Sequence, residues 1–431
     1  MKHLSKPSRA TSVALSALVL AAVSAVYGAE PAAAPAAVPD KPVKTGADKF
    51  FTEDLIGAFK NGKIILNERL RYEYADQDDL RPSNAFTLSS KFGFITAPLY
   101  GFQASLEGEN VTAFGNDNNY NDLSGNGAGR TPIADPEMTT INQYWLSYTK
   151  WDTLIKGPRQ TINLDNQRFV GPVAFRQNDQ TFDSVYIQNK SIEDTTLNFG
   201  YLYQINRILG PDNPAGVWNS QSFLFNGSWK GNQYANVTPY AYVLDFEDSS
   251  PVNSSASYGA ALTGKAILSK DADLNYRAEF TWQSDYADNP NDYGAPYYHF
   301  AVDSTIQKKW NVGIGCEVLG SDDGVSFQTP LATLHKFNGW ADRFLATPPQ
   351  GLQDLYAQAG VVLPYEIPLK FIYHKFDSDK QDINYGQEFD VEISKKFYER
   401  FTAMVAYAYF DGQSAAYPDS QRVWVQTGFV Y

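Results

Sequence analysis

LNYRAEFTWQ, residues 274–283, alternates between apolar and polar side chains at every position. Successive side chains of a β-strand point to opposite faces, so a period of two over ten residues predicts a strand with one apolar and one polar face. Similar alternation, with exceptions, runs through residues 85–96, 196–206 and 309–319. These segments predict β-structure for most of the chain.

Eighteen segments of this kind follow one another from Lys63 to Tyr431. They are 63–76, 85–96, 99–112, 138–149, 158–165, 179–189, 194–206, 220–229, 235–245, 254–268, 273–286, 295–305, 309–319, 354–362, 367–376, 384–394, 399–410 and 421–431. An even number is typical of single-chain bacterial barrels. The sequence therefore predicts an all-β fold, a transmembrane antiparallel β-barrel of about eighteen strands over residues 63–431.

The gaps between these segments are sorted by length. Every second gap has about eight residues or fewer, whereas the others include the long gaps 113–137, 166–178, 207–219 and 320–353. Short turns at one end and long loops at the other are typical of outer-membrane barrels. A soluble two-sheet sandwich also has alternating strands but gives no reason for such sorting. The sorting favours an outer-membrane barrel with both termini in the periplasm.

The C-terminal segment ends on an aromatic residue. Val423, Val425, Thr427, Phe429 and Tyr431 fall on alternate positions and so share one face of the predicted last strand. An ending of this kind resembles the recognition signal of outer-membrane barrels. We therefore expect Phe429 and Tyr431 to direct the chain to the barrel-assembly machinery.

The chain begins with features of an export signal. Lys2, Lys6 and Arg9 precede an apolar run over 12–26, which is shorter than the ~20 residues of a spanning helix. We expect residues 1–29 to be a cleaved signal peptide, residues 30–50 a Pro- and Ala-rich flexible periplasmic lead, and residues 51–62 a short helix with Thr52 as its N-cap.

Composition narrows the functional classes. Removal of three basic residues with the signal leaves 35 − 3 = 32 basic against 48 acidic residues, a net charge of −16. This acidity argues against a nucleic-acid partner, which requires clustered Lys and Arg. The single Cys316 allows no internal disulfide. The 28 Tyr and 27 Phe suit the aromatic girdles of a barrel, whose surroundings are outer-membrane lipid and lipopolysaccharide.

Motifs for catalysis are absent from the sequence. It contains no P-loop, no Gly-x-Ser-x-Gly, no paired-Cys metal pattern and no His-Glu-x-x-His. Beyond the signal only His299, His335 and His374 remain. We expect no enzyme, no catalytic residues, no metal site and no cofactor. The oxygen-rich loop 115–137 offers ligands of the kind that Ca²⁺ takes, but it lacks EF-hand spacing and a solvated loop is favoured.

Charged residues on the polar faces of the strands are the candidate pore wall. The alternation places there Arg69, Arg71, Glu73, Lys91, Glu107, Glu109, Lys265, Arg277, Glu279, Asp303, Glu317, Lys370, Glu388, Asp390 and Glu392. Channels select solutes with charged, hydrogen-bonding walls. The alternative is a mixed-charge wall that only keeps the pore wet.

A basic constriction is the sharper hypothesis. Arg168 and Arg176 flank the Gly171-Pro172 turn in a predicted loop. If the loop folds inward, both guanidinium groups would face the pore axis and bind carboxylates of acidic solutes. Alternatively, each arginine pairs with Asp165 or Asp179 and only holds the loop. The aromatic-rich stretch 328–346 is too apolar for an exposed loop and should also fold into the pore or over its mouth.

Four segments together resemble a known family. Asn163–Val170, Arg176–Asp183, Thr329–Asp342 and Leu55–Tyr72 are similar to the bacterial alginate export family. The resemblance implies an outer-membrane barrel of about eighteen strands that conducts a polysaccharide or a small solute through a charged pore. The expected function is thus passive passage of saccharides or small solutes, either anionic or uncharged. A plugged structural or adhesion barrel is the alternative, and a barrel-wall hydrolase is a weaker one.

Overall fold

The computed structural model describes residues 46–431, so the expected signal peptide and most of the expected lead lie outside the described residues. Ahead of the barrel, helical structure runs through α2 (Gly46–Lys49), η1 (Phe50–Leu55) and α3 (Ile56–Lys60). Helical structure is thus present from Gly46 on rather than from Phe51, and the stretch 43–62 contains no proline that would break it. Thr52, the expected N-cap, lies inside η1. No helix between residues 46 and 431 is long and apolar enough to cross a membrane.

Strands make up most of the second unit, which starts at Gly62. They are β1 (Lys63–Gln77), β2 (Ser83–Ile95), β3 (Phe102–Ala113), β4 (Met138–Lys150), β5 (Thr153–Gln160), β6 (Thr181–Asn189), β7 (Thr195–Asn206), β8 (Val217–Asn232), β9 (Ala235–Leu244), β10 (Ser255–Ser269), β11 (Ala272–Asp285), β12 (Gly294–Ile306), β13 (Trp310–Leu319), β14 (Ser321–Asp322), β15 (Val325–Ser326), β16 (Leu352–Leu363), β17 (Ile367–Asp377), β18 (Asn384–Phe397), β19 (Phe401–Gly412) and β20 (Ser420–Val430). Short 3₁₀ turns are η2 (Asp117–Asn119), η3 (Glu247–Ser249), η4 (Pro251–Asn253), η5 (Leu334–Lys336) and η6 (Pro364–Glu366).

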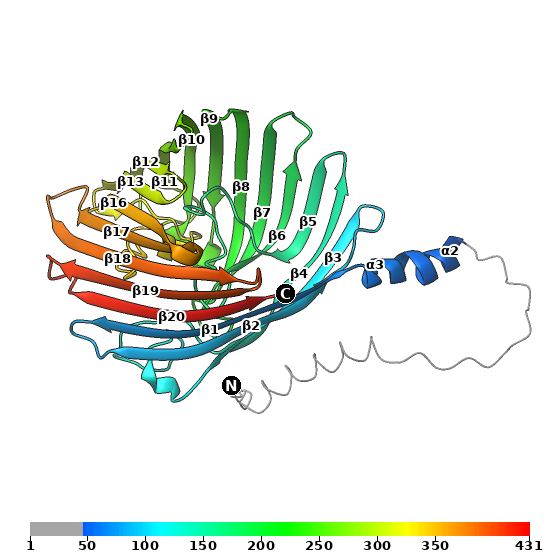
Figure 1. Cartoon of the computed structure of the whole chain (residues 1–431), viewed down its shortest axis with the longest axis horizontal. Coiled ribbons are helices and arrows are strands. Elements are labelled where there is room, and N and C mark those ends of the chain that lie inside the picture. The colour runs from blue at the N-terminus through cyan, green and yellow to red at the C-terminus, as the bar shows by residue number, and fades with distance from the viewer. Residues whose placement is uncertain (1–45) are drawn as a thin grey trace, which may run out of the picture. The chain divides into compact units, whose positions relative to one another are not determined.

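Eighteen of these strands form one closed antiparallel sheet, and only β14 and β15 form a separate hairpin. Strand β1 pairs with β2 on one side and with β20 on the other, where Asn67 lies opposite Val430 (Figure 1). The last strand ends at Val430 rather than Tyr431, but the Tyr431 N–H still donates to the Leu66 carbonyl at 2.9 Å. Closure confirms the predicted barrel and leaves the large sheet without a free edge.

The two faces of the wall follow the predicted register. On β11, Phe280 and Trp282 are 47% and 46% exposed on the outer face, whereas Glu279 and Thr281 are buried on the inner face. Other outward residues, such as Ile314 and Leu355, are also exposed and apolar. An apolar outer surface is what hydrocarbon requires of a barrel.

Turns and loops are sorted as predicted. Between successive strands, one end of the barrel (the turn end) has connections such as 151–152 and 270–271, and the other (the loop end) has 114–137, 161–180 and 320–351.

One predicted strand is displaced along the chain. Residues 158–165 are predicted to form a strand, but β5 runs over Thr153–Gln160. In the sequence the Gly157-Pro158 step suggests the end of a turn, since proline cannot donate to a ladder. Gly157 and Pro158 can nevertheless lie within β5, because the pairing of β5 with β6 omits both residues and passes from Lys156 to Arg159.

Candidate functional site

Two loops from the loop end, 161–180 and 320–351, fold into the barrel. They pack against inward-facing wall residues in one buried cluster, which joins Leu331 and Phe344 of the second loop to Tyr297, Phe410 and Trp424 of the wall. The loops also bond to each other: the Gly171 N–H donates to the Leu331 carbonyl at 2.9 Å, and the Thr333 N–H to that of Gln167 at 3.1 Å. Of the two places predicted for 328–346, into the pore or over its mouth, the structure shows the first.

Arg168 is buried at the contact between the two loops and the wall, with 1% exposure. Its Nε donates to Glu317 Oε1 of β13 at 2.8 Å, and its Nη2 donates to Asn338 Oδ1 at 2.9 Å. The Phe337 ring lies 4.8 Å from the guanidinium carbon. Burial lowers the pKa of this arginine, but Glu317 and Tyr297 together raise it above its ordinary value. Arg168 anchors the loop and presents no free guanidinium to the pore.

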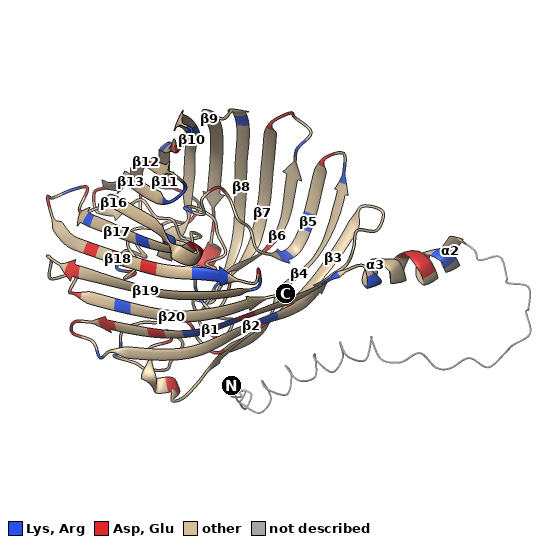
Figure 2. Cartoon of the chain, in the orientation of Figure 1, with Lys and Arg blue, Asp and Glu red and all other residues tan. Residues whose placement is uncertain are grey.

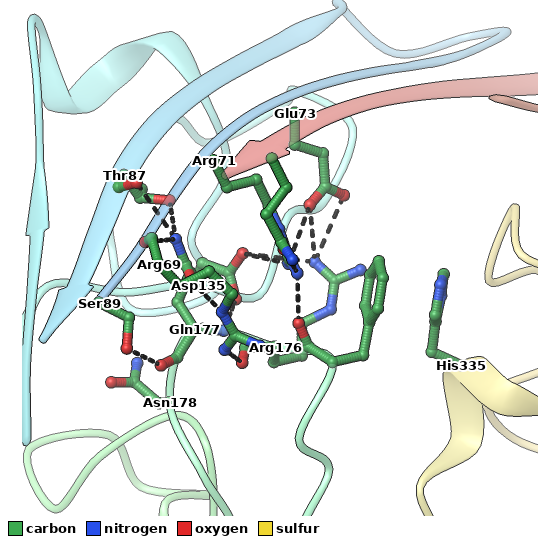
Figure 3. A network of polar contacts seen from close by, with 12 residues as sticks. Arg69, Arg71, Glu73, Thr87, Ser89, Asp135, Arg176, Gln177, Asn178 and His335 are labelled. Carbon is green, nitrogen blue, oxygen red and sulfur yellow. Dashed lines mark hydrogen bonds and ion pairs between the residues drawn. The ribbon is translucent and has the colours of Figure 1, made fainter. Parts of the chain in front are cut away.

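Arg176 is held in the same manner at the opposite end of its loop (Figure 3). Its Nη1 lies 3.2 Å from Glu73 Oε2, and its Nη2 donates to Asp342 Oδ2 at 2.9 Å. Burial opposes the charge, but Glu73, Asp135 and Asp342 raise the pKa of Arg176 above its ordinary value. Because these carboxylates surround it, Arg176 also serves to hold the loop.

Arg69 and Arg71 of β1 complete this anchor. Arg69 donates to Gln177 Oε1 at 2.8 Å and to the Ala174 carbonyl at 2.7 Å. Arg71 donates to the Phe175 carbonyl at 2.6 Å and lies 4.3 Å from the centre of the Phe175 ring. Both arginines therefore bind the backbone of loop 161–180 from the wall.

The two aspartates expected beside Arg168 and Arg176 pair with other cations. Asp165 binds Arg277 of β11, whose side chain also lies 2.8 Å from Glu279. Asp179 Oδ2 lies 2.5 Å from Lys91 Nζ of β2. The sequence hypothesis that Asp165 and Asp179 pair with Arg168 and Arg176 is wrong, because each arginine finds carboxylates on distant strands and on loop 320–351 instead.

Two lysines in the lumen contrast with these arginines. Lys336 at the tip of loop 320–351 and Lys370 on the inner face of β17 are both exposed. Among the described residues neither forms an ion pair; Lys336 Nζ donates to the Asn166 carbonyl at 2.9 Å, and Lys370 Nζ lies 5.5 Å from the Trp340 ring. Burial lowers the pKa of Lys336 below its ordinary value, against the opposing effect of Asp165. Lys336 was not singled out from the sequence, because its exposure depends on how the loop folds.

Inward-facing carboxylates are mostly covered. They include Glu73, Glu107, Glu109, Glu279, Glu317, Asp354, Glu388 and Asp390, all with 6% exposure or less. Charge is dense on β1, β17 and β18 and sparse on β7–β9, where Lys230 is the only charged residue (Figure 2). Most of the acidic residues of the wall are therefore shielded from the open lumen, although Asp303 and Glu392 are half-buried.

The remaining candidates for chemistry are structural. His299 bonds to the Tyr356 hydroxyl, His335 to Asp342 and His374 to Asp354, at 3.0, 2.8 and 2.8 Å. Within residues 46–431 no three His, Cys, Asp or Glu side chains are grouped to hold a metal ion. In the loop considered for Ca²⁺, both Asp122 oxygens accept hydrogen bonds from Ser124 or Asn126.

Comparison with known proteins gives a likeness of fold. No protein-family model matches the chain, and no curated protein matches its sequence. Among solved structures, the outer membrane protein OpdK of Pseudomonas aeruginosa has a TM-score of 0.68 at 12% identity, covering 87% of this chain and all of OpdK. OccAB2 of Acinetobacter baumannii also has a TM-score of 0.68 at 12% identity, and the match covers 87% of this chain and 99% of OccAB2. OpdK has also been solved with vanillate. The likeness shows the fold alone, which in this chain is a closed antiparallel barrel of eighteen strands.

Proposed function

We propose that the chain is an outer-membrane channel for small anionic solutes, above all carboxylates. The observation that carries the proposal is the contrast within the lumen: Lys336 and Lys370 are exposed, whereas most inward-facing wall carboxylates are buried and Asp303 and Glu392 are half-buried. Fixed cations in a narrow, low-dielectric pore concentrate anions and repel cations. Aromatic rings of Phe337 and Trp340 beside the lysines suit a carboxylate with a planar body, and the carboxylate vanillate in OpdK is consistent with this.

Ion selectivity tests the proposal. Under a salt gradient in planar bilayers, the natural barrel should prefer anions, and the Lys336→Gln/Lys370→Gln variant should shift its reversal potential toward cation preference. Lys230→Gln, at the turn end of β8, removes a charge outside this region and is the matched control. A cation-selective natural barrel, or the same reversal potential in all three proteins, would contradict the proposal.

Two finer alternatives share the fold. One follows from the resemblance to the alginate export family, which implies a polyuronate as the transported solute. Oligouronates should then block the channel current at a lower concentration than benzoate does. The two inserted loops favour a plugged structural barrel, which would show no steady open current. The bilayer recordings separate these functions from the small-anion channel.

We also propose how the chain is exported and assembled into the outer membrane. Residues 1–29 are proposed to be cleaved in the periplasm, with 30–50 as a lead, and N-terminal sequencing of the mature protein tests the cleavage. The turn end is proposed to face the periplasm. Phe429 and Tyr431 are proposed as the signal read by the barrel-assembly machinery, with lipid and lipopolysaccharide around the wall.

Deletion of 429–431 should abolish assembly. It removes the last pairs between β20 and β1 and exposes unpaired backbone to lipid. Heat-modifiable migration on gels measures folded barrel, and a normal yield from the truncated chain would contradict the assignment.

A further inference from the structure

The barrel wall has a notch at its loop end. Strand β5 is the shortest of the eighteen in the barrel, and its ladder with β4 stops at the pair of Arg159 with Tyr144. Residues 138–143 of β4 therefore have no strand on that side. Beyond Gln160 the chain leaves the wall and enters the lumen as loop 161–180, so the notch lies between β4 and the ends of β6 and β7.

A cavity of about 120 Å³ occupies this notch. One flank consists of β3 and β4 residues, and the other is the end of β7 with the start of β8. Loop 207–216 also lines it, through Gly210, Pro211 and Gly216. This loop is fixed to loop 114–137, because Asn213 Nδ2 donates to Ser124 Oγ at 3.1 Å. Ile141, 52% exposed, is among the lining residues, so the cavity reaches the outer face of the wall.

Arg207 supplies an unpaired cation on the β7 flank. Its guanidinium carbon lies 4.0 Å from the Trp218 ring, and it forms no ion pair with any residue of the described chain. Its Nε is buried without a hydrogen-bond acceptor. Burial with no anion nearby lowers the pKa of Arg207 to about 10. A desolvated guanidinium in this state is a strong site for a carboxylate or a phosphate.

Two carboxylates supply the opposite charge on the other flank. Glu109 and Asp179 both line the cavity, with side chains 0% and 8% exposed. Lys91 Nζ lies 3.3 Å from Glu109 Oε1 and 2.5 Å from Asp179 Oδ2, and Arg69 is a second cation close to both carboxylates. Glu109 Oε1 and Asp179 Oδ1 nevertheless accept no hydrogen bond. This flank therefore presents two buried carboxylate oxygens that lack a hydrogen-bond donor.

The other charged group of the lining is already neutralised. Arg159 binds Asp183 through two hydrogen bonds, from Nε at 2.6 Å and from Nη2 at 2.8 Å. The cavity thus has an unpaired cation on one flank and two carboxylate oxygens without a donor on the other. A plain anion would leave those two oxygens without a donor, and a plain cation would leave Arg207 without an anion.

We propose that this cavity binds a zwitterion, with its ammonium group on Asp179 and Glu109 and its phosphate or carboxylate on Arg207. The two charged groups must be joined by a short linker, because the cavity is small. Two sources share this chemistry: a free solute of amino-acid type, and the phosphoethanolamine headgroup of a membrane lipid that enters from the outer face beside Ile141. The site lies in the wall, apart from Lys336 and Lys370, and is independent of the proposed permeation path.

Calorimetric titration of the purified full-length barrel in detergent tests the site. Phosphorylethanolamine and glycine carry both charges, whereas inorganic phosphate and ethanolamine carry one each. The natural barrel should bind at least one of the two zwitterions at least about tenfold more tightly than either one-charge probe. Arg207→Gln should weaken that binding by about ten- to a hundredfold, the usual loss for a hydrogen bond to a charged group. Lys230→Gln is the control and should bind as the natural barrel does.

Native mass spectrometry with phosphatidylethanolamine and phosphatidylglycerol separates the two sources. Retention of the ethanolamine lipid by the natural barrel, lost in Arg207→Gln, supports the headgroup. Zwitterion binding in solution without lipid retention supports a free solute. The proposal is overturned if phosphate alone binds as tightly as phosphorylethanolamine, if folded Arg207→Gln binds as the natural barrel does, or if neither zwitterion nor lipid binds. Heat-modifiable migration shows that each variant is folded.

Discussion

Arg168 and Lys336 carry the same charge inside the same barrel, yet their surroundings differ completely. Arg168 lies in a dry region where two loops meet the wall, and Glu317 and Asn338 accept hydrogen bonds from its guanidinium group. Lys336 is a close neighbour of Asn338 in loop 320–351, but it is exposed in the open lumen and forms no ion pair within the described chain. What decides the role of an inward-facing charge is therefore whether a loop covers it.

The largest expected effect comes from Arg168→Ala. It leaves Glu317 buried without its cation, and the loss of one partner of a buried pair costs about 3–5 kcal/mol. Loop 161–180 should then leave the wall, which limited proteolysis of the loop and noisier single-channel currents would report. Arg168→Ala/Glu317→Gln removes the unpaired charge and should restore part of the docking. A protease-resistant loop in the single variant would show that this region is not held by the ion pair.

A second test places the same new charge on three surfaces. Phe280→Arg puts a cation in hydrocarbon, at a cost of ~2–4 kcal/mol near the midplane. Thr281 faces inward, but it is fully buried and bonded to the Tyr240 hydroxyl, so Thr281→Arg should also impair folding. Gln358, half-buried on the inner face of β16, should accept arginine. The yield of folded barrel in bilayers measures how well each of the three variants is tolerated. If arginine were tolerated equally at Thr281 and at Gln358, the distinction between the loop-covered wall and the open lumen would be wrong.

The smallest expected effect is a pH dependence of loop docking. Burial lowers the pKa of His335 below its ordinary 6.5, although Asp342 opposes this. Above pH 6.5 His335 is mostly neutral whether the loop is docked or free. Below pH 6.5 His335 becomes protonated in the free loop, whereas in the docked loop its lowered pKa keeps it neutral. Docking therefore weakens as pH falls, by at most about 1.4 kcal/mol for each pH unit.

Channel noise near pH 7.5 and near pH 5 measures this effect. Burial raises the pKa of Asp342, but His335, Arg176 and Arg422 outweigh burial and hold it well below its ordinary value, so Asp342 stays ionised in this range. His335→Gln should remove the pH dependence. The idea fails if the natural loop becomes quieter as the solution is acidified.

The strands were predictable from the sequence because their signal is local. A period of two placed β11 and its neighbours in register, and the loop lengths distinguished the two ends of the barrel. The partners of the inserted loops were not predictable in this way. Arg168 and Glu317 are 149 residues apart in the chain, and sequence proximity suggested Asp165 instead. Burial of the wall acids likewise depends on how the loops fold, so the sequence overestimated the acidity of the lumen.

Strand β20 links closure of the barrel to the filling of its interior. Arg422 on this last strand donates to Glu73 of β1 at 3.0 Å, to the Ala341 carbonyl at 3.0 Å and to the Pro132 carbonyl at 3.1 Å. These partners come from the first strand and from two different loops. Pairing across such a separation in sequence is slow to form. The final strand satisfies its arginine only when loop 320–351 lies in the lumen, so insertion of the loop and closure of the seam stabilise each other.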